Sequence, residues 1–228
     1  MNNTIAGTQQ KALAINRDPL SYGSFAEIGA GQEVARWFFH VGGAAATVAK
    51  TISAYDMKVS TGLYGTTSHY VSRQRLEAML DYEYAQLVER LGPSRAEQTN
   101  FFVFADTVAT SQQPGTGRGW VGVRFQTQPR ADTSEVIIHV HLSDPTAAQQ
   151  QEALGVLGVN LLFGALQQSH EPETLIGALL DDLSGNRVEI DMIKFSGPAF
   201  ATVDNRLMSL QPMPAMNKSI ADIRGFCL

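Results

Sequence analysis

Cysteine is almost absent from the 228-residue sequence: its single cysteine is Cys227, so one chain cannot form an internal disulfide. Charged residues make up only 17%, and 17 basic residues face 22 acidic ones, for a net charge of −5. This balance does not suit a general binder of polyanions, so we expect no nucleic-acid partner. The most apolar run, Ala153 to Leu166, is shorter than the roughly 20 residues of a membrane span. With no signal-peptide pattern near Met1, these features predict a cytoplasmic protein that does not associate with membranes.

The overall composition is typical of a folded domain, because hydrophobic residues make up 44% of the chain. We predict one α+β domain over residues 1–211, with a helical part (1–95), a sheet-containing part (96–211) and a C-terminal tail (212–228). N-terminal helices are expected to precede a mixed, antiparallel-rich sheet, with helices packed mainly on one face.

Helical signals dominate the first part. A capping-box pattern at Ser24–Glu27 predicts a helix over Phe25–His40, and Ala44–Met57 is interpreted as a second helix. The clearest periodicity predicts a helix over Arg73–Leu91, which Gly92-Pro93 should end.

The period then changes to that of strands. Three segments rich in aromatic and β-branched residues predict an antiparallel meander: Phe101–Val108, Trp120–Thr127 and Glu135–Leu142. Asp144-Pro145 should cap a buried helix that runs to about Gln168. The segments that remain are interpreted as a helix, a fourth strand and a last helix: Pro172–Leu183, Val188–Phe195 and Pro198–Leu210.

Strict alternation gives each of the later strands an apolar and a polar face. In the fourth strand it groups Met192 with the apolar Val188 and Ile190. The polar positions could share one open face: Arg124, Gln126, His139, His141, Glu189 and Asp191. Such a face is either a solvated surface with cross-strand charge pairs or a surface that binds a ligand or another subunit.

Three groups of residues are candidates for a small anionic ligand. The Gly29 and Gly31 loop with Arg36 invites a phosphate-site interpretation, although it matches neither the Rossmann nor the P-loop pattern and lacks a preceding strand. Arg73 and Arg75 in the first turn of a helix could hold an anion, or Glu77 could relieve their charge. Further ligand-binding candidates are Arg124, Asp106 and Asp191. The two aspartates, like Glu189, are strand carboxylates that could act as general acids or bases if buried.

His139 and His141 place two imidazoles on one face of a strand, a spacing found in some metal sites. Asp144 follows closely, but no third ligand is recognisable, and paired strand histidines are also common surface residues. We therefore predict no metal site and no cofactor, with these two histidines as the only metal candidates.

Several long strings resemble the N-terminal half of a bacterial family whose members carry names such as nicotinate-nucleotide adenylyltransferase or TonB-dependent receptor. The resemblance covers roughly Ala14 to Leu210 and rests on five strings: Phe25–Phe39, Tyr70–Leu76, Phe101–Thr107, Phe195–Phe200 and Val203–Met208. It implies an adenylyltransferase-type activity by name only. The sequence has no HxGH-type motif, and the resemblance supplies no catalytic residues.

No complete catalytic pattern emerges from these features. The sequence therefore predicts a non-catalytic binding or self-assembly module, expected to be a homo-oligomer. The alternative is a nucleotide- or phosphate-binding enzyme or sensor.

Overall fold

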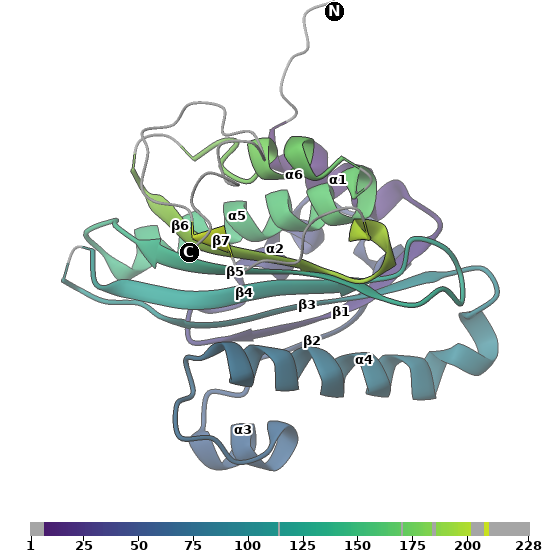
Figure 1. Cartoon of the computed structure of the whole chain (residues 1–228), viewed down its shortest axis with the longest axis horizontal. Helices are drawn as coiled ribbons and strands as arrows, with labels where there is room; N and C mark the ends of the chain where they lie inside the picture. The colour runs from purple at the N-terminus through teal and green to yellow at the C-terminus, as the bar shows by residue number, and fades with distance from the viewer. Residues whose placement is uncertain (1–6, 114, 170, 184–185, 202–207, 210–228) are drawn as a thin grey trace, which may run out of the picture.

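A mixed β-sheet lies at the centre of the molecule, with helices on both of its faces (Figure 1). The computed structural model describes residues 7–113, 115–169, 171–183, 186–201 and 208–209. Seven strands lie in the order β2-β1-β3-β4-β5-β6-β7. The predicted α+β class is confirmed. Within the described residues, no helix is both long and apolar enough to cross a lipid bilayer.

The sheet combines a short parallel part with a longer antiparallel part. β1 pairs in parallel with both β2 and β3, and every later pair, from β3–β4 to β6–β7, is antiparallel. The predicted meander is therefore present. The strands are β1 (Ser21–Ile28), β2 (Val48–Ile52), β3 (Asn100–Ala109), β4 (Gly117–Phe125), β5 (Ser134–Leu142), β6 (Val188–Ser196) and β7 (Met208–Ser209).

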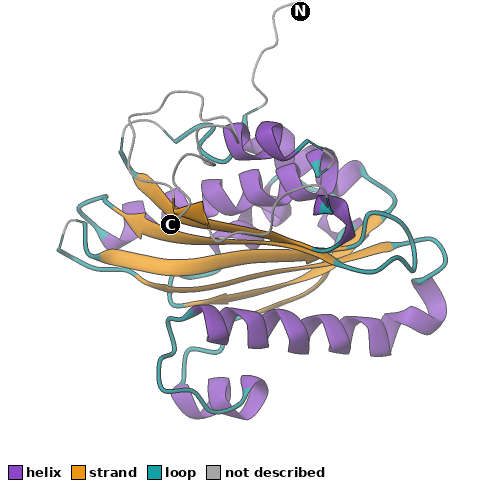
Figure 2. Ribbon diagram, in the orientation of Figure 1, coloured by secondary structure: helices purple, strands orange, loops and turns teal. Residues whose placement is uncertain are grey.

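The helices divide unequally between the two faces (Figure 2). One face carries α1 (Thr8–Arg17), α2 (Glu33–His40), α5 (Ala147–Gln168) and α6 (Pro172–Ala178). The other carries α4 (Arg73–Arg95), with α3 (Met57–Tyr64) packed beside it. Most helices thus lie on one face, as expected, while α4 covers part of the face that the sequence left open.

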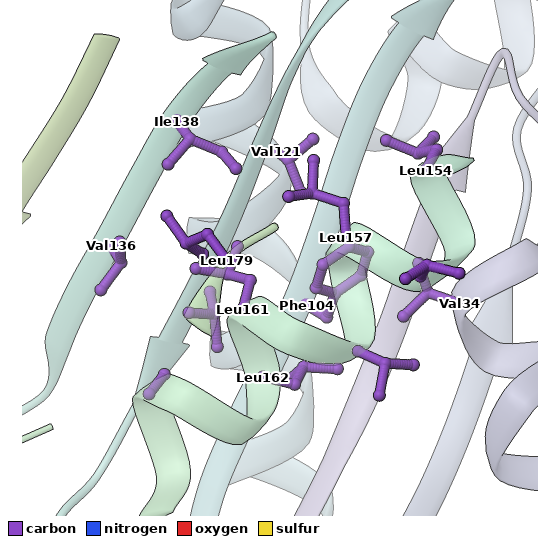
Figure 3. Close-up of a cluster of buried hydrophobic side chains, with 14 of the residues drawn as sticks. Val34, Phe104, Val121, Val136, Ile138, Leu154, Leu157, Leu161, Leu162 and Leu179 are labelled. Atoms are coloured by element: carbon purple, nitrogen blue, oxygen red, sulfur yellow. The ribbon is translucent and has the colours of Figure 1, made fainter. Parts of the chain in front are cut away.

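The larger core lies between the sheet and α5 (Figure 3). The middle of α5 is buried nearly all round because α1, α2 and α6 pack against it from outside. Gly158 permits this contact, since a Cβ there would lie 2.3 Å from a methyl carbon of Val34. On the opposite face, Leu76 and Leu80 of α4 pack over Gly122 of β4.

Two strands interrupt the part of the chain that was predicted to be helical. The predicted helix Phe25–His40 is β1 followed by a glycine loop and α2, and the predicted helix Ala44–Met57 contains a 3-10 turn and β2. β1 is nearly buried on both sides, so it lacks the alternation by which a half-buried strand is recognised. Glu27 does cap a helix, but through its side chain to α2 rather than as part of a capping box.

Other predicted boundaries also shift. α4 continues past Pro93 to Arg95, because a proline in the last turn removes only one hydrogen-bond donor. Thr146, not Asp144, caps α5 by accepting from the Gln149 N–H. The predicted helix Pro198–Leu210 is a 3-10 turn at Pro198–Phe200, and its far end holds the short β7. The predicted tail, 212–228, lies outside the described residues.

Candidate metal centre

Two histidines of β5 converge on one carboxylate of β6. The Nδ1 atom of His139 lies 2.7 Å from Asp191 Oδ1, and the Nε2 atom of His141 lies 2.9 Å from Asp191 Oδ2. The three side chains are partly accessible, with exposed fractions of 17%, 35% and 33% for His139, His141 and Asp191. The prediction that the two imidazoles share one face is confirmed. We call these three residues the His-His-Asp trio.

A β-bulge in β6 brings Asp191 to this position. In the β5–β6 register His139 faces Met192, whereas the next residue, Val140, faces Ile190. Asp191 is therefore the extra residue, and a bulge of this kind re-aims a side chain. The bulge also corrects the predicted faces of β6: Ile193 and Phe195 join Val188 and Ile190 in the core, while Met192 is only partly buried.

Trp120 borders the trio on the side of β4. It is the cross-strand partner of His139, and the two ring centroids lie 4.7 Å apart. Beyond it, the Thr107 hydroxyl of β3 donates to the Tyr70 carbonyl just before α4, at 2.6 Å. The trio thus lies on the same face as α4, on the part of the sheet that this helix leaves accessible.

The donor set suits a divalent transition-metal ion. The ligand atoms of the trio lie within 4.8 Å of one another, and no other group of three histidine, cysteine, aspartate or glutamate side chains in the described part of the chain meets this condition. Tetrahedral coordination with bonds of about 2.1 Å places ligand atoms about 3.4 Å apart. The nitrogen–oxygen separations of 2.7 and 2.9 Å would have to widen by about 0.5–0.7 Å to admit an ion.

Two acidic residues, which we call the Glu27–Asp106 pair, are buried on the other face of the sheet. The two residues are register partners in β1 and β3, with exposed fractions of 1% and 0%. Glu27 accepts from the N–H groups of Val34 and Ala35 in the first turn of α2, each at 2.9 Å. Asp106 Oδ1 accepts from the Ile28 N–H at 3.1 Å, and its Oδ2 is buried without a hydrogen-bond partner among the described residues.

Burial sets the proton affinity of this pair. Loss of water raises the pKa of Glu27 to about 7, although backbone N–H groups of α2, chiefly those of Ala35 and Val34, oppose the shift. Burial, and then the charge of Glu27, raises the pKa of Asp106 well above its ordinary range. Glu27 has two backbone donors and Asp106 has one, so any single negative charge of the pair resides mainly on Glu27.

The predicted phosphate loop forms a tight link between β1 and α2. Gly29 and Gly31 both have positive φ, at 100° and 82°. A Cβ on Gly29 would lie 1.8 Å from the carbonyl oxygen of Val108, so the loop packs directly against β3. The N–H donors that a phosphate would use at the start of α2 bond to Glu27 instead.

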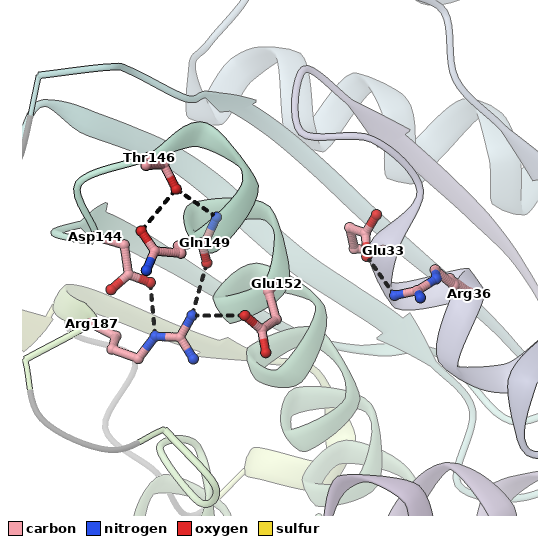
Figure 4. Close-up of polar contacts among 7 residues, drawn as sticks. All are labelled: Glu33, Arg36, Asp144, Thr146, Gln149, Glu152 and Arg187. Atoms are coloured by element: carbon pink, nitrogen blue, oxygen red, sulfur yellow. Dashed lines mark hydrogen bonds and ion pairs between the residues drawn. The ribbon is translucent and has the colours of Figure 1, made fainter.

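Arginines predicted to bind an anion have other partners. Arg36 pairs with Glu33 at 3.3 Å on the outside of α2 (Figure 4). Asp144, which the sequence placed near the histidines, binds Arg187 at 2.8 Å in a separate network with Gln149 and Glu152 (Figure 4).

The arginines of α4 and β4 also bind within the protein. Arg73 pairs with Glu77 at 3.4 Å, as in the alternative considered from the sequence. Arg75 is 2% exposed and donates to the carbonyls of Ser60 and Gly65, at 3.4 and 2.7 Å. Arg124 donates to Asp81 and Glu135, each at 2.6 Å. The structure does not bring the predicted glycines and arginines into one site.

The comparisons with known proteins give a fold likeness only. No family model matches the chain, and no curated protein matches it. A competence/damage-inducible protein of Agrobacterium tumefaciens is similar at 19% identity and a TM-score of 0.47, over 69% of this chain and 94% of that one. One of Enterobacter asburiae is similar at 16% identity and a TM-score of 0.49, over 73% and 100%.

A competence-damaged protein (CinA) superfamily protein of Escherichia coli is similar at 13% identity and a TM-score of 0.49, over 72% of this chain and 91% of that one. These solved structures carry neither of the two names that the strings in the sequence suggested. The comparisons therefore contradict the resemblance to the family named for nicotinate-nucleotide adenylyltransferase or TonB-dependent receptor.

Proposed function

We propose that this chain is a binding protein for a divalent transition-metal ion, held by the His-His-Asp trio. The observation that carries the proposal is the convergence of His139 and His141 on Asp191, at 2.7 and 2.9 Å. Imidazole and carboxylate together favour ions such as Zn²⁺, Co²⁺, Ni²⁺ and Cu²⁺ over Ca²⁺ or Mg²⁺, which prefer oxygen ligands. This gives the predicted binding module a ligand class.

The position of Trp120 provides a direct assay. Because its indole lies 4.7 Å from the His139 ring, a paramagnetic ion bound there should quench its fluorescence. The other tryptophan, Trp37, lies on α2, so a Trp37→Phe background leaves Trp120 as the single reporter. We expect saturable quenching by Co²⁺ or Cu²⁺. Zn²⁺ at about 100 times its Kd should stabilise the fold by about 2.7 kcal/mol.

Variants separate this site from accidental binding. His139→Ala and Asp191→Ala should each weaken the affinity for Co²⁺ by about 100-fold or more. Losing a residue that only supports a metal ligand already costs up to about 100-fold, and these two residues are the proposed ligands themselves. His40→Ala is the matched control, because His40 is exposed at the end of α2 on the opposite face. Equal Co²⁺ affinity in the His139→Ala and His40→Ala variants would refute the proposal.

Self-assembly and nucleotide binding stay predictions, with tests of their own. A homo-oligomer should appear in light scattering at micromolar concentrations, and a strict monomer would contradict it. A nucleotide or phosphate ligand should raise the melting temperature of the metal-free protein. The bonds from Glu27 to α2 favour the metal proposal over this second one, since they use the donors that a phosphate needs.

A further inference from the structure

Arg118 lies beside the trio, and its side chain has no acidic partner among the described residues. It is the cross-strand partner of His141, so both side chains leave the sheet on the same face. The residue is exposed, and its side chain makes no hydrogen bond or ion pair with another described residue. Arg124 of the same strand, by contrast, is bonded to two carboxylates.

The charges around the trio favour an anion once a metal ion is bound. Asp191 supplies one carboxylate, and Glu189, which faces His141 from β6, supplies a second. Arg118 and a divalent ion bring three positive charges, so the loaded centre carries a net positive charge. Three protein ligands also leave at least one coordination position of the ion open.

The open position should lie on the side of His141 and Arg118. The indole of Trp120 packs against His139 at an interplanar angle of 50° and borders that side of the trio. Accordingly His139 is 17% exposed and His141 is 35% exposed. A ligand approaching from solvent therefore meets the ion and the guanidinium of Arg118 together.

We infer that the metal-loaded centre binds a small oxyanion, a carboxylate or phosphate group, between the ion and Arg118. The inference rests on the proposed function. One oxygen of the ligand would fill the open coordination position, and a second would accept from the guanidinium, which binds oxyanions through two parallel N–H groups. No bond in the ligand needs to break.

The test uses the Co²⁺-loaded chain, whose visible absorption reports the coordination of the ion. Acetate and inorganic phosphate are titrated separately at constant ionic strength, and the tighter of the two identifies the preferred group. We expect a saturable change in the cobalt spectrum. Arg118→Ala should weaken the anion by about tenfold, the value of one charge-assisted interaction, without weakening Co²⁺ itself. Arg118→Lys should weaken the anion less.

Arg36→Ala is the matched control, because Arg36 is an exposed arginine on α2. If Co²⁺ binds but neither anion changes its spectrum, the oxyanion inference is wrong and the proposed function stands. The oxyanion inference is also wrong, and the proposed function again stands, if Arg118→Ala and Arg36→Ala bind the anion equally. If Co²⁺ does not bind at all, both proposals are wrong.

Discussion

Two aspartates of one sheet, Asp191 and Asp106, lie on opposite faces and differ in what surrounds them. Asp191 is 33% exposed, and each of its oxygens lies against an imidazole nitrogen that could instead ligate an ion. Asp106 is fully buried beside Glu27, and the one hydrogen bond that its side chain makes with a described residue comes from a backbone N–H. Side-chain partners near solvent can exchange with a ligand, whereas a backbone donor inside the core cannot. The first aspartate is therefore suited to binding and the second to holding the fold.

The largest effect should distinguish these roles by stability. Glu27→Ala leaves the buried N–H groups of Val34 and Ala35 without an acceptor, which should cost about 4 kcal/mol at pH 5. Asp191→Ala removes a partly exposed carboxylate and should cost less than about 1 kcal/mol in the metal-free chain. Urea denaturation measures both. If Asp191→Ala destabilised the chain as much as Glu27→Ala, the trio would be a structural feature.

The next effect is the dependence of stability on pH, which should come mainly from the buried pair. A folded-state pKa raised above its unfolded value contributes stability that is complete below the unfolded pKa and is lost as pH rises through the folded one. For Glu27, whose pKa rises from 4.5 to about 7, the loss between these values is about 3 kcal/mol. Urea midpoints at pH 5, 6, 7 and 8 measure it.

The raised pKa of Asp106 acts in the same direction, so Asp106→Asn should make the decline with pH shallower. The matched control is Glu89→Gln, which removes an exposed carboxylate of α4 and should leave the decline as it is. Identical slopes in the native chain and the Asp106→Asn variant would show that Asp106 does not contribute.

The smallest effect has the opposite sign and concerns the trio. Metal ligation requires an imidazole nitrogen without a proton, so Co²⁺ affinity should rise by about tenfold or more between pH 5.5 and 7.5. Over the same range the fold should become less stable because of the buried pair. Quenching of Trp120 measures the affinity. An affinity that does not change with pH would mean that the histidines are not ligands.

The sequence predicts the parts of this fold whose periodicity is undisturbed by their neighbours. β4, β5 and α4 pack one face against a core, so alternation or helical spacing identifies them. β3 is buried on both faces and is identified instead by its run of aromatic and β-branched residues. β1 was missed because it is nearly buried on both sides, and because its Gly23 serves the packing of Phe102, whose ring lies 2.6 Å from where a Cβ would be. Ser24 and Glu27 match the capping-box pattern, but in the structure Glu27 caps α2, which begins six residues later at Glu33.

The trio shows the same limit at the level of a site. The spacing of His139 and His141 predicts two imidazoles on one face, and alternation puts Asp191 on the polar face of its strand. The bulge that aligns Asp191 with both histidines depends on the pairing of β5 with β6, which no local pattern records. The glycine loop shows a related limit: the N–H donors that a phosphate would use bond to Glu27, an acid of the preceding strand.

The bulge in β6 makes the site depend on chain length as well as on residue identity. Deleting Met192 would restore regular pairing between β5 and β6. Asp191 would then lie directly opposite His139, and only diagonally across from His141, whose direct partner is Glu189. All three ligands would still be present in such a sequence, yet they would no longer converge. A chain that retains both histidines and the aspartate can therefore lose the site through a single deleted codon, and counting residues between Asp191 and Phe195 becomes as informative as finding the ligands.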